Sequence, residues 1–85
     1  MASSLITPAI IIPVTIRNTR SVPLRFRLEP WGEEYTIEPE SEAQLEFRGP
    51  EGDSPVIEWG EDTVTAYGWS GSTVRVFVDH QEVGV

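Results

Sequence analysis

The chain has 85 residues, which is enough for one small domain with a single core. It carries 14 acidic and 6 basic residues, and its net charge of −8 disfavours nucleic acids and anionic membranes as partners. The absence of cysteine excludes disulfides and thiolate metal ligands, and it favours a cytoplasmic location. The N-terminus lacks the basic region of a signal peptide, and no apolar stretch approaches the ~20 residues of a membrane span.

Residues 1–13 form an apolar arm that is interrupted by Pro8 and Pro13. Because proline cannot donate a hydrogen bond to a β-ladder, we expect this arm to be an edge strand or an extended wrap. Its aliphatic side chains are unusual for a solvated tail, so we expect the arm to pack on its own domain or on a second copy. Residues 14–85 are then expected to form the domain itself.

From residue 14 onward, apolar and polar side chains alternate with a period of two, which is the pattern of half-buried β-strands. The clearest segment is 24–29, where leucine and phenylalanine alternate with arginine and glutamate. The segments predicted as strands are 14–17, 24–29, 34–38, 45–48, 57–59, 63–67, 74–79 and 82–83. Glycine, proline and polar residues predict turns between them at 18–23, 30–32, 39–41, 49–55, 60–62, 68–72 and 79–80.

No window shows the 3.6-residue period of an amphipathic helix. About seven short strands with turn signals between them predict an all-β fold. We expect a single small antiparallel β-sandwich or barrel, immunoglobulin-like or cupredoxin-like, without a metal site. The predicted core consists of Val14, Ile16, Leu24, Phe26, Leu28, Ile37, Leu45, Phe47, Ile57, Val64, Val74, Val76 and Val78.

The charge is divided unevenly along the chain. Residues 1–28 contain four arginines and no acid, for a charge of +4, whereas residues 29–85 contain 14 acids and two arginines, for a charge of −12; the two add up to −8. We expect Arg25 and Arg27 to lie across a sheet from Glu34, Glu38 or Glu46, so that the asymmetry sets strand register. The alternative is a basic stripe that meets an acidic partner.

The residues needed for common active sites are missing. A blue-copper site needs two histidines, a cysteine and usually a methionine, but this chain has only His80, which falls in a predicted turn. The segment GWSGS at 68–72 lacks the last glycine of a nucleophile elbow. We therefore predict no catalytic residue, no metal ligand and no cofactor. Acidic loops at 50–54 and 59–63 could ligate calcium, but solvated turns are the favoured interpretation.

The three tryptophans are the most informative residues. Trp31, Trp59 and Trp69 each lie next to a glycine near a predicted strand end. The favoured interpretation is that they cover the ends of the core. The alternative is an exposed aromatic platform, with Glu33 and Glu34 as polar partners, that binds a sugar ring or a protein.

The segments LEPWGEEYTIEPES at 28–41, FRGPEG at 47–52 and YGWSGSTVRVF at 67–77 resemble a group of small uncharacterised bacterial proteins. In that group a strand ends in a Pro-Trp-Gly turn, and a late Gly-Trp segment leads into the last hairpin. The resemblance implies a compact β-sandwich, and it implies no function because the group has no established activity.

Three functions remain open at this stage. The leading hypothesis is a non-catalytic interaction or assembly module, with a protein partner or a second copy bound through the N-terminal arm. The second is a carbohydrate-binding module that uses the aromatic turns. The least favoured is a small hydrolase with a carboxylate pair, which would need a cleft that a domain of this size has little room to form.

Overall fold

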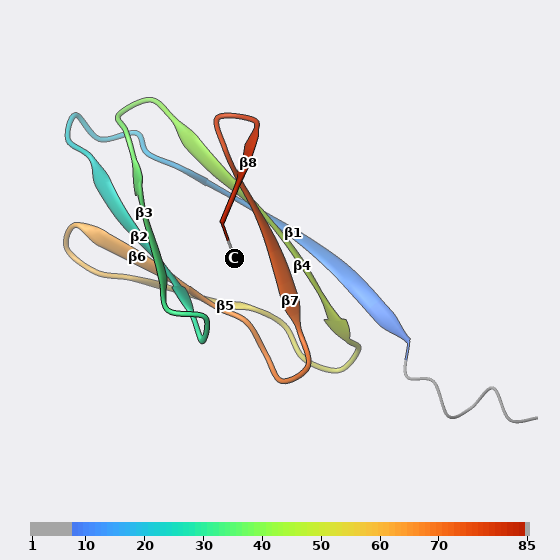
Figure 1. Cartoon of the computed structure of the whole chain (residues 1–85). Coiled ribbons are helices and arrows are strands. Elements are labelled where there is room, and N and C mark those ends of the chain that lie inside the picture. Colours follow the sequence, from blue (N-terminus) through green and yellow to red (C-terminus); the bar gives the residue numbers. More distant parts are fainter. Residues whose placement is uncertain (1–7, 85) are drawn as a thin grey trace, which may run out of the picture.

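The computed structural model describes residues 8–84, which form eight strands in two four-stranded sheets (Figure 1). The strands are β1 (Ala9–Arg17), β2 (Leu24–Glu29), β3 (Glu33–Ile37), β4 (Glu42–Pro50), β5 (Val56–Trp59), β6 (Thr63–Tyr67), β7 (Thr73–Val78) and β8 (Gln81–Val83). This architecture confirms the predicted all-β sandwich. The described residues contain no helix, and hence none that is long and apolar enough to cross a membrane.

The two sheets differ in how their strands pair. One has the order β1-β4-β7-β8 with all neighbours antiparallel, and the other has the order β3-β2-β6-β5. In the second sheet β2 and β6 run parallel, while the two outer pairs are antiparallel. The four connections 18–23, 38–41, 51–55 and 68–72 pass from one sheet to the other, whereas the remaining turns close hairpins.

The core lies between the sheets and follows the predicted alternation closely. Ten of the thirteen predicted core residues are buried, and Val14, Ile57 and Val78 are only partly buried. Val14 and Ile57 lie on edge strands, where the facing sheet covers them less completely, and Val78 ends β7. Three further buried residues, Ala43, Ala66 and Trp69, were not included in the predicted core.

The second half of the predicted arm is part of the sandwich. Residues 9–13 begin the edge strand β1 and pair with residues 46–50 of β4, while residues 1–7 lie outside the described residues. The Pro8 carbonyl accepts a hydrogen bond from the Glu51 N–H, and the Asn18 N–H donates to the Ser41 carbonyl. Even-numbered residues of β1 therefore direct their main-chain groups toward β4, and Pro13 faces the open edge, where its missing N–H disrupts no ladder.

The turn from β7 to β8 matches its prediction. Asp79 and His80 have φ angles of 51° and 68°, so both occupy the left-handed region that a two-residue hairpin turn of this kind requires. His80 is exposed, as expected for a turn residue. The predicted loop at 49–55 is shorter than expected, because Gly49 and Pro50 continue β4.

Three of the four early arginines pair with the protein's own carboxylates. Arg17 lies 3.3 Å from Glu42 across β1 and β4. Arg25 and Arg27 lie 3.9 Å and 3.7 Å from the same oxygen of Glu34 across β2 and β3. The contacts of Arg25 and Arg27 with Glu34 are among the predicted cross-strand pairs, and Arg27 and Glu34 are direct register partners, whereas the Arg17–Glu42 pair was not predicted.

Candidate functional site

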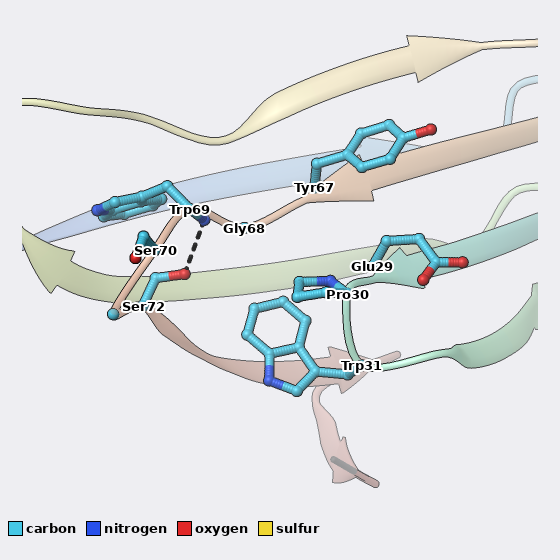
Figure 2. A pocket seen from close by; sticks show the side chains of 9 residues that line it. Glu29, Pro30, Trp31, Tyr67, Gly68, Trp69, Ser70 and Ser72 are labelled. Atoms are coloured by element: carbon cyan, nitrogen blue, oxygen red, sulfur yellow. Dashed lines mark hydrogen bonds between the residues drawn. The ribbon is translucent and has the colours of Figure 1, made fainter.

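An open hollow of about 550 Å³ lies at the end of the sandwich where β2 and β6 finish (Figure 2). It is formed by the turn after β2 and the connection after β6, two segments that lie far apart in the sequence. Two of the three tryptophans, Trp31 and Trp69, line it. The full lining consists of Glu29, Pro30, Trp31, Tyr67, Gly68, Trp69, Ser70, Gly71 and Ser72.

The two segments of the hollow are tied together by the main chain of Gly68. Its N–H donates a 2.8 Å hydrogen bond to the Glu29 carbonyl. The ring of half-buried Trp31 lies so close to Gly68 that a Cβ at that position would overlap it. Gly32, with a φ of 72°, supplies the left-handed residue of the turn that carries Trp31. The glycines beside the tryptophans therefore allow the close approach of the two segments.

Trp69 forms the inner wall of the hollow and also covers the core. It is 9% exposed, and its ring lies 6.1 Å from that of Phe47 between centroids. Its indole N–H donates to the Pro50 carbonyl at 2.9 Å, and its main-chain N–H donates to the Ser72 hydroxyl at 2.9 Å. Trp69 is thus a lid on the end of the core, the favoured interpretation of its sequence, and it is held in place without a ligand.

Trp59 does not join this site. It lies on the edge strand β5, opposite Val64 of β6, and 61% of its surface is exposed. Val56, at the other end of β5, is the residue that pairs with Tyr67 of the hollow. The three tryptophans therefore form no common platform: one covers the core, one is half-buried in a turn and one is exposed on an edge.

The predicted polar partners of the tryptophans also lie elsewhere. Glu33 accepts a 3.0 Å hydrogen bond from the Tyr35 hydroxyl, and Glu34 is paired with Arg25 and Arg27. Neither glutamate lines the hollow, because both belong to β3 beyond the turn. The carbohydrate site predicted from Trp31, Trp59 and Trp69 with Glu33 and Glu34 is accordingly not assembled in one place.

Sequence reasoning missed Glu29 and Tyr67, which supply the charged and phenolic groups of the lining. The Tyr67 hydroxyl donates a 2.8 Å hydrogen bond to Glu58, and this bond raises the pKa of Tyr67 above its usual value. Glu29 is half-buried, and no arginine of the described chain lies within ion-pair distance of it. In Figure 2 the oxygens of Glu29 and Tyr67 point away from the two indoles. The only signal for these residues was their position next to the Pro-Trp-Gly and Gly-Trp segments.

Within residues 8–84, no three side chains of histidine, cysteine, aspartate or glutamate gather closely enough to hold a metal ion. The two acidic loops considered for calcium lie at opposite ends of the sandwich, because one follows β4 and the other joins β5 to β6. The sequence matches no family model, and no curated protein or solved structure is significantly similar to it.

Proposed function

We propose that this chain is a non-catalytic interaction module that associates with a second copy of itself through the β5–β6 hairpin. The observation that carries this proposal is the exposure of Trp59, at 61%, on an edge strand. Five large hydrophobic side chains are exposed in residues 8–84, and three of them, Val56, Trp59 and Tyr67, belong to this hairpin. Val56 and Tyr67 are register partners and lie on one face of the hairpin, whereas Trp59 pairs with the buried Val64 and lies on the other face. Exposed apolar groups on both sides of one sheet edge are typical of a strand that pairs with another chain.

The main chain of β5 supports the same surface. The Gly60 N–H donates to the Thr63 carbonyl, so the even-numbered residues of β5 face β6. Ile57 and Trp59 therefore direct their N–H and carbonyl groups to the open side of the sheet. An edge strand with unpaired main-chain groups and exposed apolar side chains can accept another strand.

The other three edges are less suited to association. β1 has Pro13 on its open side, which removes a donor from the middle of the strand. β8 has only three residues, and β3 begins with two glutamates. Short strands, charges and proline are the features that keep sheet edges from pairing. We therefore place the contact at β5 rather than at the N-terminal arm.

The charge of the chain gives this association a distinctive salt dependence. β5 itself carries one charge, on Glu58, so repulsion between two paired β5 strands is small. Each copy as a whole carries −8, and the two copies repel each other over longer distances. Because salt screens this repulsion and leaves apolar burial intact, the dimer should become more stable as the salt concentration rises.

Sedimentation velocity over a range of about 5 to 500 μM, in low and high salt, tests the proposal. We expect a dimer that increases with concentration and salt, and that weakens at least about tenfold in Val56→Ser and Trp59→Ser. Ile11→Ser is the matched control, since Ile11 is 49% exposed on β1, which belongs to the other sheet. A monomer under every condition, or an equal effect of the control, would overturn the proposal.

A further inference from the structure

We propose that the hollow between Trp31 and Trp69 binds a small soluble compound with a trimethylammonium group. The cation would contact the face of an aromatic ring, with Glu29 supplying the negative charge. This site shares Tyr67 with the β5–β6 hairpin, but Trp59, whose exposure carries the proposed self-association, lies outside it. It gives the chain a second binding activity that does not require Trp59.

The aromatic lining suits a cation. Trp31, Tyr67 and Trp69 surround the hollow from two different segments, and aromatic rings attract cations through the negative potential of their faces, with tryptophan the strongest. Figure 2 shows the Trp31 ring broadly displayed at the hollow, beside Pro30. Tyr67 donates its hydroxyl hydrogen to the Glu58 carboxylate, and this bond increases the electron density of its ring.

The charges of the lining exclude an anion and favour a cation. Glu29 is the one charged residue that lines the hollow, and it has no arginine within ion-pair distance among residues 8–84. The Glu29 oxygens point away from the two indoles, so the carboxylate attracts a cation at the Trp31 ring through its charge and not by direct contact. The charge of −12 carried by residues 29–85 raises the local concentration of cations further.

The hydrogen bonds of the lining favour a cation over a sugar. The Tyr67 hydroxyl donates to Glu58, the Ser72 hydroxyl accepts from the Trp69 main chain, and the Trp69 indole donates to Pro50. A sugar needs several free donors and acceptors that converge on its hydroxyls. Three polar side-chain groups of the lining are therefore engaged, and the Trp31 indole N–H, the Ser70 hydroxyl and the Glu29 carboxylate have no hydrogen-bond partner among residues 8–84. Two neutral polar groups are few for the hydroxyls of a sugar, whereas a trimethylammonium group needs only a ring face and a nearby carboxylate.

The hollow is also preformed and of suitable size. Hydrogen bonds from Gly68 to Glu29 and from Trp69 to Ser72 and Pro50 hold its walls within the protein itself. Its volume of about 550 Å³ is within the usual range for small-molecule sites. Little ordering is therefore required when a ligand binds, which reduces the entropic cost of binding.

The test is a titration of the ¹⁵N-labelled protein with choline chloride, observed by NMR at the Trp31 indole and the Gly68 and Ser70 amides. Sodium chloride is exchanged for choline chloride so that the ionic strength stays constant. The compound 3,3-dimethylbutan-1-ol is the neutral isostere of choline, and methyl glucoside represents a sugar. We expect saturable shifts with choline below about 50 mM, with the isostere at least about tenfold weaker and no saturation with the sugar.

Two variants locate the site. Glu29→Gln keeps the shape and removes the charge, so it should weaken choline binding about threefold or more, whereas Glu40→Gln, at the opposite end of the sandwich, should not. Trp31→Ala, with folding checked by thermal melting, should abolish saturation at Gly68. Trp59→Ser, at the end of β5 far from the hollow, should leave choline binding unchanged, which separates this site from the proposed dimer.

Several results would overturn the inference. These are the absence of saturation with choline, equal binding of the neutral isostere, saturation with the sugar, or unchanged affinity in Glu29→Gln. Vesicles of phosphatidylcholine present the same group on a membrane. Their co-sedimentation with the protein at choline-like affinity would overturn the assignment to a free small molecule.

Discussion

Replacing Asn18 should reveal how the end of the sandwich opposite the hollow is held together. Asn18 is 1% exposed and is the buried polar residue of the described chain. Its Nδ2 donates to the carbonyls of Val22 and Ile37 at 2.8 Å and 2.9 Å, and its Oδ1 accepts from the Arg20 N–H at 2.9 Å. One side chain thus joins the connection after β1 to the end of β3, and hence links the two sheets.

The cost of Asn18→Ala can be estimated bond by bond. Losing the buried bond to the Ile37 carbonyl costs about 1–3 kcal/mol, and each of the two partly buried bonds contributes about 0.5–1.5 kcal/mol. The total is about 2–6 kcal/mol, which is a large share of the roughly 4–13 kcal/mol expected for a domain of this length. The free energy of unfolding in urea, followed by tryptophan fluorescence, measures this loss.

Asn18→Asp separates hydrogen bonding from shape. The carboxylate can still accept from the Arg20 N–H, but its second oxygen faces two carbonyl oxygens, so burial and repulsion should raise the pKa of this carboxyl in the folded state. A raised folded pKa gives stability that is present at low pH and is lost as pH rises through that pKa. The deficit relative to the natural protein should therefore grow from about pH 4 to pH 7. A loss below about 0.5 kcal/mol in Asn18→Ala, no larger than in the exposed control Thr19→Ala, would refute the reasoning.

Three further changes test other parts of the structure. Gly49→Ala should destabilise the fold by about 1–3 kcal/mol in thermal melting, because its Cβ would lie 2.9 Å from both the Trp69 ring and Ser72. Burial, aided by the bond to Glu33, raises the pKa of Tyr35 to about 12, so the unfolded chain ionises first and stability falls as pH rises from 10 toward that value. Tyr35→Phe should reduce this alkaline loss, and an unchanged loss would contradict the assignment. Trp59→Phe should shift the fluorescence emission to the blue and reduce acrylamide quenching, whereas a red shift would contradict the exposure of this indole.

Much of the fold could be predicted because its strands are half-buried. Alternation identifies both the strand and the face that enters the core, as it does for Leu24, Phe26 and Leu28, all at most 1% exposed. Alternation predicts burial less well on edge strands, because these lack one neighbouring strand. There an inward side chain such as Ile57 stays partly exposed. The parallel pairing of β2 with β6 could not be predicted, because periodicity carries no information about which strands become neighbours.

The hollow could be predicted only in part, because its walls come from long-range contacts. The sequence indicated that Trp31 and Trp69 lie at strand ends, but nothing in it showed that Gly68 would bond to Glu29, 39 residues earlier. Gly49 next to Pro50 is a turn signal, yet Gly49 is buried in β4, where the missing side chain makes room for Trp69. The local preferences of glycine are the same in a turn and in a buried strand. Only the side chain that packs against the glycine distinguishes the two cases.

The uneven distribution of charge along the sequence has two consequences. The early arginines pair with the protein's own carboxylates and so set strand register, and the acids that stay unpaired make their surroundings negative. Arg17 with Glu42 and Arg27 with Glu34 are direct register partners, and three of these four side chains are more than half exposed. Such pairs contribute only about 0–1 kcal/mol each, so their main effect is on register: a slip of one residue would turn Arg27 toward the core. Because these arginines neutralise carboxylates on β3 and β4, the acids left without a partner determine the field elsewhere. Glu29 is one of them: its carboxylate points away from the two indoles, but as the one charged group of the lining it makes the hollow electrostatically favourable for a cation.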